Sequence, residues 1–432
     1  MKDVTWLSNM KLRLGWGRTG NAGSATSNAI NQLGSTEYRF YPAGTSTQGF
    51  VRGNGLAQLI IANPSLKWET NEQTNIGLDF GLLNGDLNVT LDYFVRDSKD
   101  LLLYQSVRPS SGYQTYYNNI GLIRNTGLEF SVAYNKRLNK DWTIGATLTG
   151  STLKNKVKEC GLDIFNECSG GNDGSNIDGS NVQAINSSGY KWQNHSITRE
   201  GYAVGSYYGW QTDGIFRSQE EIDAYGVKDE SGNAYKPGDV KFVDQNGDGQ
   251  IDASDMVVLG NGFPKFNFGL TLNASYKNWD ASIYTYGVLG QDILSYSAMR
   301  LSTMLADADQ VPNILQDSYD RSFTNNPNGD LPRLVIQDDV KNTRCSDLWV
   351  KNGNFFKINT IQVGYTFPRQ WLAPLKITSA RASLTINNLL CISPYNKYGD
   401  PECGQGSVVY TGLDTGRYPT PRTYSLGLSV QF

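Results

Sequence analysis

Charge is scarce in this chain of 432 residues, and so are cysteine, methionine and histidine. Charged residues make up 18% of the sequence, against roughly 25% in a typical globular domain. The net charge at pH 7 is −3. This balance, without any polybasic run, argues against a nucleic-acid partner. No run of about 18 apolar residues is present, so we expect no transmembrane helix.

The chain also has little that could carry catalysis. Its single histidine, His195, lies in a polar stretch and is expected to be a solvated loop residue. Neither a Gly-x-Ser-x-Gly elbow nor a phosphate-binding Walker loop occurs. The five cysteines show no Cys-x-x-Cys spacing, so structural zinc is not expected. We therefore predict that the protein is not an enzyme.

What the sequence does contain is long alternation of apolar and polar residues. Strict alternation predicts a β-strand with one apolar and one polar face. Soluble strands are usually about 5–6 residues long, whereas strands that cross a membrane need roughly 9–11. The alternating runs here are of the longer kind. They cover residues 87–93, 126–134, 268–276, 361–367 and 424–432.

Two all-β architectures fit such strands. An outer-membrane barrel turns the apolar faces to lipid, keeps a polar lumen and carries aromatic residues at both interfaces. A large soluble β-sandwich with exposed tyrosines is the alternative. Aromatic residues at the strand ends favour the barrel and are predicted to form its interfacial belts. They are Tyr93, Phe94, Tyr134, Trp142, Tyr276, Trp279, Tyr284, Tyr286, Phe355, Phe356 and Phe367.

Short turns alternate with long polar segments along the chain. Leu83–Asp86 contains Asn-Gly, which tolerates positive φ at both central positions, and residues 139–141 and 277–279 are similarly tight. Bacterial outer-membrane barrels have short turns on one side and long loops on the other, and we count on the order of 10–13 strands. The long polar segments run over residues 159–190, 210–263 and 293–354.

Six short motifs are spread over nearly the whole chain. They are Lys11–Asn21, Asn63–Phe80 (with NPSLKWET and NIGLDF), Asn118–Glu129, Gly238–Asp244, Gly260–Phe266 and Tyr418–Tyr424. In this order and spacing they resemble the SusC/RagA family, the TonB-linked outer-membrane transporters of Bacteroidetes-type bacteria. Each motif alone is weak, but the joint resemblance is specific.

The resemblance implies a longer parent with a signal peptide, an N-terminal carboxypeptidase-like domain, a TonB-contacting segment, a plug and a barrel of about 22 strands. Residues 1–432 would be the C-terminal half of that antiparallel transmembrane barrel, without the plug and the N-terminal domains. The absence of an apolar signal region after Met1 fits such a fragment. Because unpaired backbone groups cost several kcal/mol each in lipid, we expect an open curved sheet that is unstable alone in a membrane.

The function implied by the resemblance is nutrient import across the outer membrane of a Gram-negative, Bacteroidetes-like cell. The implied partners are a SusD-like surface lipoprotein, the TonB complex (through the missing N-terminal part) and a cargo, with oligosaccharide as the first choice and peptide as the second. A siderophore or corrinoid receptor is one alternative. A surface glycan-binding β-protein without a transport role is another.

One loop has the ligand spacing of a calcium site. Residues 244–255 fit D-x-N-x-D-G-x-I-D-x-x-D, with Gly249 at the turn position. EF-hand loops take oxygens from positions 1, 3, 5, 7, 9 and 12, and hard oxygen ligands favour Ca²⁺. A metal-free loop rich in Asx turns remains the alternative. The predicted ligands are Asp244, Asn246, Asp248, the Gln250 carbonyl, Asp252 and Asp255, in a structural site that faces the cell exterior.

Two cysteine pairs bracket short segments. Cys160 could pair with Cys168, and Cys391 with Cys403, which leaves Cys345 over. Outside the inner membrane each bridge would contribute about 2–3 kcal/mol. Free thiols at these four positions remain the alternative.

The last strand resembles the signal that the outer-membrane assembly machinery reads. The chain ends in alternation and a terminal phenylalanine, which suits strand addition to an exposed sheet edge. An ordinary last strand is the alternative. The residues of the predicted signal are Tyr424, Leu426, Leu428, Val430 and Phe432.

Overall fold

The structure is a computed structural model. It describes residues 6–22, 33–40, 51–58, 60–106, 110, 113, 115–159, 181–183, 195–304, 313–336, 338, 340–404 and 411–432.

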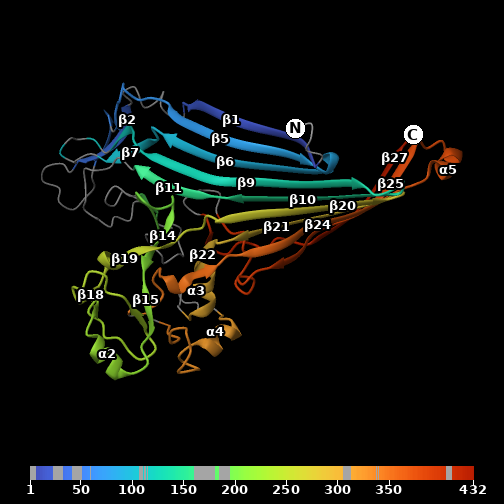
Figure 1. The fold of residues 1–432 in the computed structure, drawn as a ribbon. Helices are drawn as coiled ribbons and strands as arrows, with labels where there is room; N and C mark the ends of the chain where they lie inside the picture. The colour runs from blue at the N-terminus through green and yellow to red at the C-terminus, as the bar shows by residue number, and fades with distance from the viewer. Residues whose placement is uncertain are drawn as a thin grey trace.

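One large antiparallel sheet dominates the described part of the chain (Figure 1). Its strands lie in the order β1-β5-β6-β9-β10-β20-β21-β24-β25-β27, and β11 (Lys154–Glu159) also pairs with β9. The sheet is open, because β1 and β27 stand at the two ends of this order. The strand bounds are β1 Leu7–Asn21, β5 Glu69–Leu82, β6 Leu87–Lys99, β9 Leu122–Arg137, β10 Trp142–Thr152, β20 Phe266–Tyr276, β21 Trp279–Leu289, β24 Phe355–Thr366, β25 Ser379–Ile392 and β27 Thr423–Gln431.

The connections confirm the predicted alternation of short and long. Short turns join β5 to β6, β9 to β10 and β20 to β21, and a connection with helix α5 (Arg369–Leu372) joins β24 to β25. In the first turn Asn84 and Gly85 have φ values of 59° and 93°, as Asn-Gly predicts. The other ends of the strands carry the long connections, which gather opposite α5 in Figure 1. These long connections cover residues 22–68, 100–121, 153–265, 290–354 and 393–422.

The two faces of the sheet differ in polarity, as the alternation predicts. On one face, large apolar side chains point into the surroundings instead of a core. Leu14 on β1 is 73% exposed, Leu128 on β9 56% and Leu426 on β27 88%. The opposite face carries the charged, hydroxyl and amide side chains of the same strands. Exposed leucines spread over a whole face indicate an apolar environment outside the protein.

The long connections are partly folded into small elements of their own. None of the helices in the described part of the chain is long and apolar enough to cross a membrane. The helices are α2 Gln219–Tyr225, α3 Tyr296–Ser302 and α4 Gln316–Arg321, with 3-10 turns η1 Leu83–Gly85, η3 Ala253–Asp255, η4 Asp347–Trp349 and η5 Ala373–Leu375. The small strands are β2 Leu33–Phe40, β3 Val51–Gln58, β4 Ile60–Ile61, β7 Leu102–Ser106, β8 Thr115–Asn119, β12 Asn181–Gln183, β13 Ser196–Thr198, β14 Ser206–Trp210, β15 Thr212–Ile215, β16 Lys228–Asp229, β17 Val240–Phe242, β18 Gln250–Ile251, β19 Met256–Gly260, β22 Asp292–Ser295, β23 Val350–Asn352 and β26 Leu413–Asp414.

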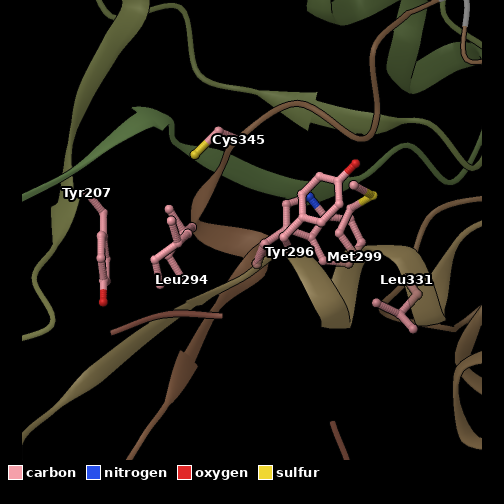
Figure 2. Close-up of a cluster of buried hydrophobic side chains, with 8 residues drawn as sticks. Tyr207, Leu294, Tyr296, Met299, Leu331 and Cys345 are labelled. Atoms are coloured by element: carbon pink, nitrogen blue, oxygen red, sulfur yellow. The ribbon is translucent and has the colours of Figure 1, made fainter. Parts of the chain in front are cut away.

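Three of the long connections pack together into one body, which we call the loop subdomain: the described residues of 195–263, 290–354 and 393–422. Its main core joins side chains from all three connections, including Tyr207, Trp349 and Leu413. Figure 2 shows this cluster, with Tyr296 and Met299 projecting from α3. Two smaller cores complete it, one around Phe216 and one around Phe242. The segments predicted as long polar loops therefore contain a water-excluding core.

Two buried carboxylates of the loop subdomain are paired with arginines. Asp239 is fully buried and accepts hydrogen bonds from Arg333 at 2.5 Å and from the Asn342 amide at 2.9 Å. Arg344 donates to buried Asp229 at 2.7 Å and stacks over the Trp210 ring, with 4.8 Å between the guanidinium carbon and the ring centroid. Paired charges of this kind hold segments that are far apart in the sequence.

His195 corrects the sequence prediction of a solvated loop residue. Its side chain is 1% exposed, directly before β13. Burial lowers its pKa to about 4, because the protonated ring would lose its water shell. The polar neighbours in the sequence gave no sign of this, since β13, which follows His195 directly, pairs with β14 only in the folded subdomain.

Candidate functional site

The polar face of the sheet contains a cavity of about 680 Å³. Five adjacent strands, β6, β9, β10, β20 and β21, form its floor, and Glu402 of the loop subdomain reaches its rim. The polar residues along these strands line it because every second side chain points to the same face. They are Thr90, Asp92, Glu129, Ser131, Thr149, Ser151 and Asn267.

Strand register aligns two of the cavity's carboxylates, Asp92 and Glu129, in one row. Asp92 on β6 lies opposite Glu129 on β9, and Glu129 lies opposite Ser151 on β10. Directly opposite residues have Cβ atoms about 4.5–5.5 Å apart, so the two carboxylates are neighbours of like charge. The next partner in the row is Asn267 on β20.

An arginine on the edge strand neutralises part of this row. Arg13 on β1 donates to Asp92 at 2.8 Å and to both oxygens of Asp79, at 2.8 and 2.9 Å. The arginine lies over Gly77, where a Cβ would come within 2.8 Å of the guanidinium carbon. A glycine at this position therefore lets one cation bridge two carboxylates.

At the other side of the cavity, Glu402 anchors the loop subdomain to the sheet. Its carboxylate accepts hydrogen bonds from the Tyr286 hydroxyl and from the Lys357 ammonium group. Lys357 is 3% exposed, so this ion pair is largely screened from water. The connection between β25 and β27 is thus fixed against β21 and β24 by an ion pair between a buried lysine and a half-buried glutamate.

Aromatic side chains form one wall of the cavity. The rings of Tyr284 and Tyr286 are stacked, with centroids 5.9 Å apart and planes 19° apart, and Phe355 meets Tyr286 edge-on at 5.6 Å. Tyr284 remains 42% exposed. The sequence assigned both tyrosines to interfacial belts, and this was wrong. Their register partners on β20, Thr271 and Gly269, belong to the polar face.

This arrangement suits binding more than chemistry. Hydroxyl, amide and carboxylate groups stand beside a flat ring face, and within the described lining no nucleophile–base pair is present. Sequence reasoning could have found these residues by following the polar phase of each alternating strand. It could not have found that Glu402 joins them from more than a hundred residues away.

The predicted calcium loop, residues 244–255, follows β17 in the loop subdomain and includes β18 and η3. Asp244 accepts hydrogen bonds from the backbone N–H groups of Gly247 and Gly249, at 2.6 and 2.8 Å, and these bonds lower its pKa. Asp255 is fully buried and accepts from the N–H groups of Gln245 and Asp252. Gly249 has a φ of +83°, as its turn position predicts.

Residues 246–250, in the middle of this loop, form hydrogen bonds with one another. Asn246 donates to Asp248 at 2.9 Å, and the Gln250 N–H also bonds Asp248. Within the described residues, no group of three or more metal-binding His, Cys, Asp or Glu side chains is assembled. Calcium binding by Asp244, Asn246, Asp248, Gln250, Asp252 and Asp255 stays a prediction.

The cysteines correct one predicted bridge. Cys391 and Cys403 are both free thiols. Cys391 is held in the β24–β25 ladder opposite Lys357. Cys403 lies in the connection after β25, where burial raises its pKa to about 12 and keeps the thiol protonated and unreactive. Cys160 and Cys168 lie outside the described residues, so their pairing stays a prediction.

The predicted assembly signal lies on the terminal strand. β27 pairs with β25 through Leu426 opposite Leu384 and Val430 opposite Ala380, and it ends the described strand order. Phe432 follows the strand and is 87% exposed. An edge strand with a free side is available for pairing, but its role as a signal stays a prediction.

Comparison with known proteins places this geometry among outer-membrane receptors. A family model described as "TonB dependent receptor-like, beta-barrel" matches residues 3–389. The TonB-dependent receptor P3 of Formosa agariphila is 28% identical over 440 residues, covering 100% of this chain and 40% of the relative. The TonB-dependent receptor SusC of Bacteroides thetaiotaomicron is 29% identical over 438 residues, covering 100% and 38%.

A solved structure has the same fold. The RagAB peptide importer in its open-open state superposes with a TM-score of 0.75 at 21% identity, over 100% of this chain and 41% of that one. At this identity the likeness concerns the fold alone. The chain spans about two fifths of the length of the curated relatives it matches.

Proposed function

The chain belongs to the TonB-dependent receptor β-barrel family, and we propose that it forms part of a SusC/RagA-type importer that carries a nutrient across the outer membrane. The family consists of receptors and transporters, not enzymes. The observation that carries the proposal is the 11-stranded sheet, with leucines exposed on one face and a cavity on the opposite, polar face. In the proposed location the leucines contact lipid and the cavity lines the lumen.

The relatives support a two-protein importer. By similarity to SusC and the RagAB importer, we expect that a SusD-like surface lipoprotein covers the barrel. The loop subdomain lies at the end of the strands opposite the short turns, so it is the part that such a lipoprotein would contact. Energy would come from the TonB complex, through parts of the full-length relatives that this chain does not match.

The proposed cargo is an oligosaccharide or a peptide. A lumen wall of hydroxyl, amide and tyrosine groups supports both, because each can hydrogen-bond sugar hydroxyls or peptide groups and stack on a ring. A siderophore or corrinoid receptor is a second candidate within transport. A surface glycan-binding protein without transport is the candidate outside it.

The test is deletion of the encoding gene in the bacterium that makes the protein. We expect loss of growth on one oligosaccharide or peptide source and recovery on complementation. A second strain without functional TonB should show the same loss. Uptake that persists without the gene, or binding at the cell surface without any TonB-dependent uptake, would contradict an importer.

A further inference from the structure

We propose that the lumenal cavity selects cargo by charge, with Glu129 as the specificity-determining residue that disfavours anionic molecules. The inference rests on the proposed transport function and deepens it. Three carboxylates (Asp92, Glu129 and Glu402) line the cavity, and none of its lining residues in the described part of the chain is a lysine or arginine. The ligand class it suits is therefore uncharged or cationic.

The charges around the cavity balance except for one. Arg13 bridges Asp92 and Asp79, and Lys11 on the same strand lies opposite Asp79 in the β1–β5 register, whereas Arg18 pairs with Glu72. Lys357 neutralises Glu402. Within the described residues no ion pair involves Glu129, and its side chain is exposed. One uncompensated negative charge thus remains on the wall.

The position of this charge makes it effective. Glu129 stands on β9, the second of the five floor strands, between Asp92 on one neighbouring strand and Ser151 on the other. An anionic group on the cargo would meet Glu129 and the partly compensated Asp92, and the described lining offers no lysine or arginine to pair with it. An uncharged polar cargo would instead find hydrogen-bond acceptors, with Tyr284 as an exposed stacking surface.

The negative charge of Glu129 should create a negative electrostatic potential at the cavity floor. Charged thiol reagents measure this local potential directly. Ser151→Cys places a thiol opposite Glu129, and Gln362→Cys places one on the same face of β24, between the uncharged partners Ser282 and Thr385. The probes are the cationic 2-(trimethylammonium)ethyl and the anionic 2-sulfonatoethyl methanethiosulfonates. Both react with the same thiolate, so their rate ratio cancels the thiol's own pKa.

The labelling is done on the protein in the outer membrane of its own bacterium, and each site is followed by peptide mass spectrometry. We expect the cation-to-anion rate ratio at position 151 to exceed that at position 362 about fivefold, the effect of one unit charge at roughly 8 Å in water. Glu129→Gln should reduce the ratio at 151 to the value at 362.

Equal ratios at the two positions, or a ratio at 151 that Glu129→Gln leaves unchanged, would overturn the proposal. This readout does not depend on uptake. Failure of the labelling contrast with intact TonB-dependent growth would refute charge selection alone, whereas the growth test refutes the transport function.

Discussion

The sheet and the loop subdomain differ in where they place their large apolar side chains. In the sheet, leucines such as Leu14 and Leu426 are largely exposed, whereas in the subdomain Trp349, Leu294 and Phe242 are fully buried. The first arrangement is stable only where the surroundings are apolar, and the second works in water. One chain therefore combines the surface of a membrane protein with the core of a soluble one.

This difference separates what the two regions depend on. The sheet takes its backbone hydrogen bonds from neighbouring strands and its apolar contacts from the surroundings. The subdomain depends on contacts between its three connections, for example the Tyr207 hydroxyl donating to the carbonyl groups of Asp292 and Thr411 at 2.8 and 3.1 Å. Mutations should therefore affect one region without the other.

Trp349→Ala should give the largest effect. Trp349 lies in the main core of the subdomain and its side chain is 0% exposed. Removal of a buried tryptophan side chain costs about 3–5 kcal/mol. We expect hydrogen exchange to accelerate in residues 206–260 and 292–302, with little change in β6 and β9. Trp371→Ala, at a tryptophan that is 62% exposed, is the control. Equal loss of protection in both regions would contradict independent stabilisation.

Leu148→Arg should have the next largest effect. Leu148 points from β10 to the apolar face, where an arginine near the middle of a bilayer costs about 2–4 kcal/mol. Thr147→Arg, one residue earlier on the polar face, should be tolerated. The amount of folded protein in outer-membrane fractions measures both. Equal amounts for the two variants would refute the assignment of the faces.

Acidification should destabilise the subdomain through His195. Its pKa of about 4 in the folded protein lies below the ordinary value of 6.5, so the unfolded chain binds the proton more readily. Stability is present above pH 6.5 and is lost as pH falls towards 4, by up to about 3 kcal/mol. Hydrogen exchange of β13 and β14 between pH 7 and 5 checks this, and His195→Gln should flatten the profile. A wild-type profile identical to that of the variant would exclude the histidine.

Calcium should have a smaller, local effect. Calorimetry on the membrane-extracted protein should show heat of calcium binding that the double change Asp244→Ala and Asp248→Ala abolishes, because it removes two of the predicted ligand oxygens. Hydrogen exchange in residues 244–255 should slow with calcium in the wild type only. Identical heats for the two proteins would discard the site.

Deletion of Phe432 should have the smallest effect on the folded structure, because the residue is 87% exposed and follows the last strand. Its expected effect is on assembly: about twofold less protein in the outer membrane and more degradation in the periplasm. Phe432→Tyr should assemble normally, since it keeps the terminal aromatic ring. Unchanged assembly of the deletion would remove the signal.

The alternation of apolar and polar residues predicted the strands of the sheet. The loop subdomain and the cavity rim depend on contacts between residues far apart in the sequence. Alternation over residues 126–134 predicted β9, and Asn84-Gly85 predicted the turn between β5 and β6, because both depend on neighbours in sequence. The subdomain core depends on Tyr207 meeting Leu413, and the cavity rim on Tyr286 meeting Glu402. Such contacts produce no periodic pattern in the amino-acid sequence. The long segments were therefore predicted as polar loops and Tyr284 as a residue of an interfacial belt.

The apolar face of the sheet is expected to contact lipid while the opposite face lines an aqueous lumen. Nitroxide scanning along β10, from position 143 to 149, tests it in outer-membrane vesicles. Oxygen accessibility should peak at 144, 146 and 148, and accessibility to a water-soluble nickel complex should peak at 143, 145, 147 and 149. Equal accessibility along the strand, or the reverse phase, would contradict the account.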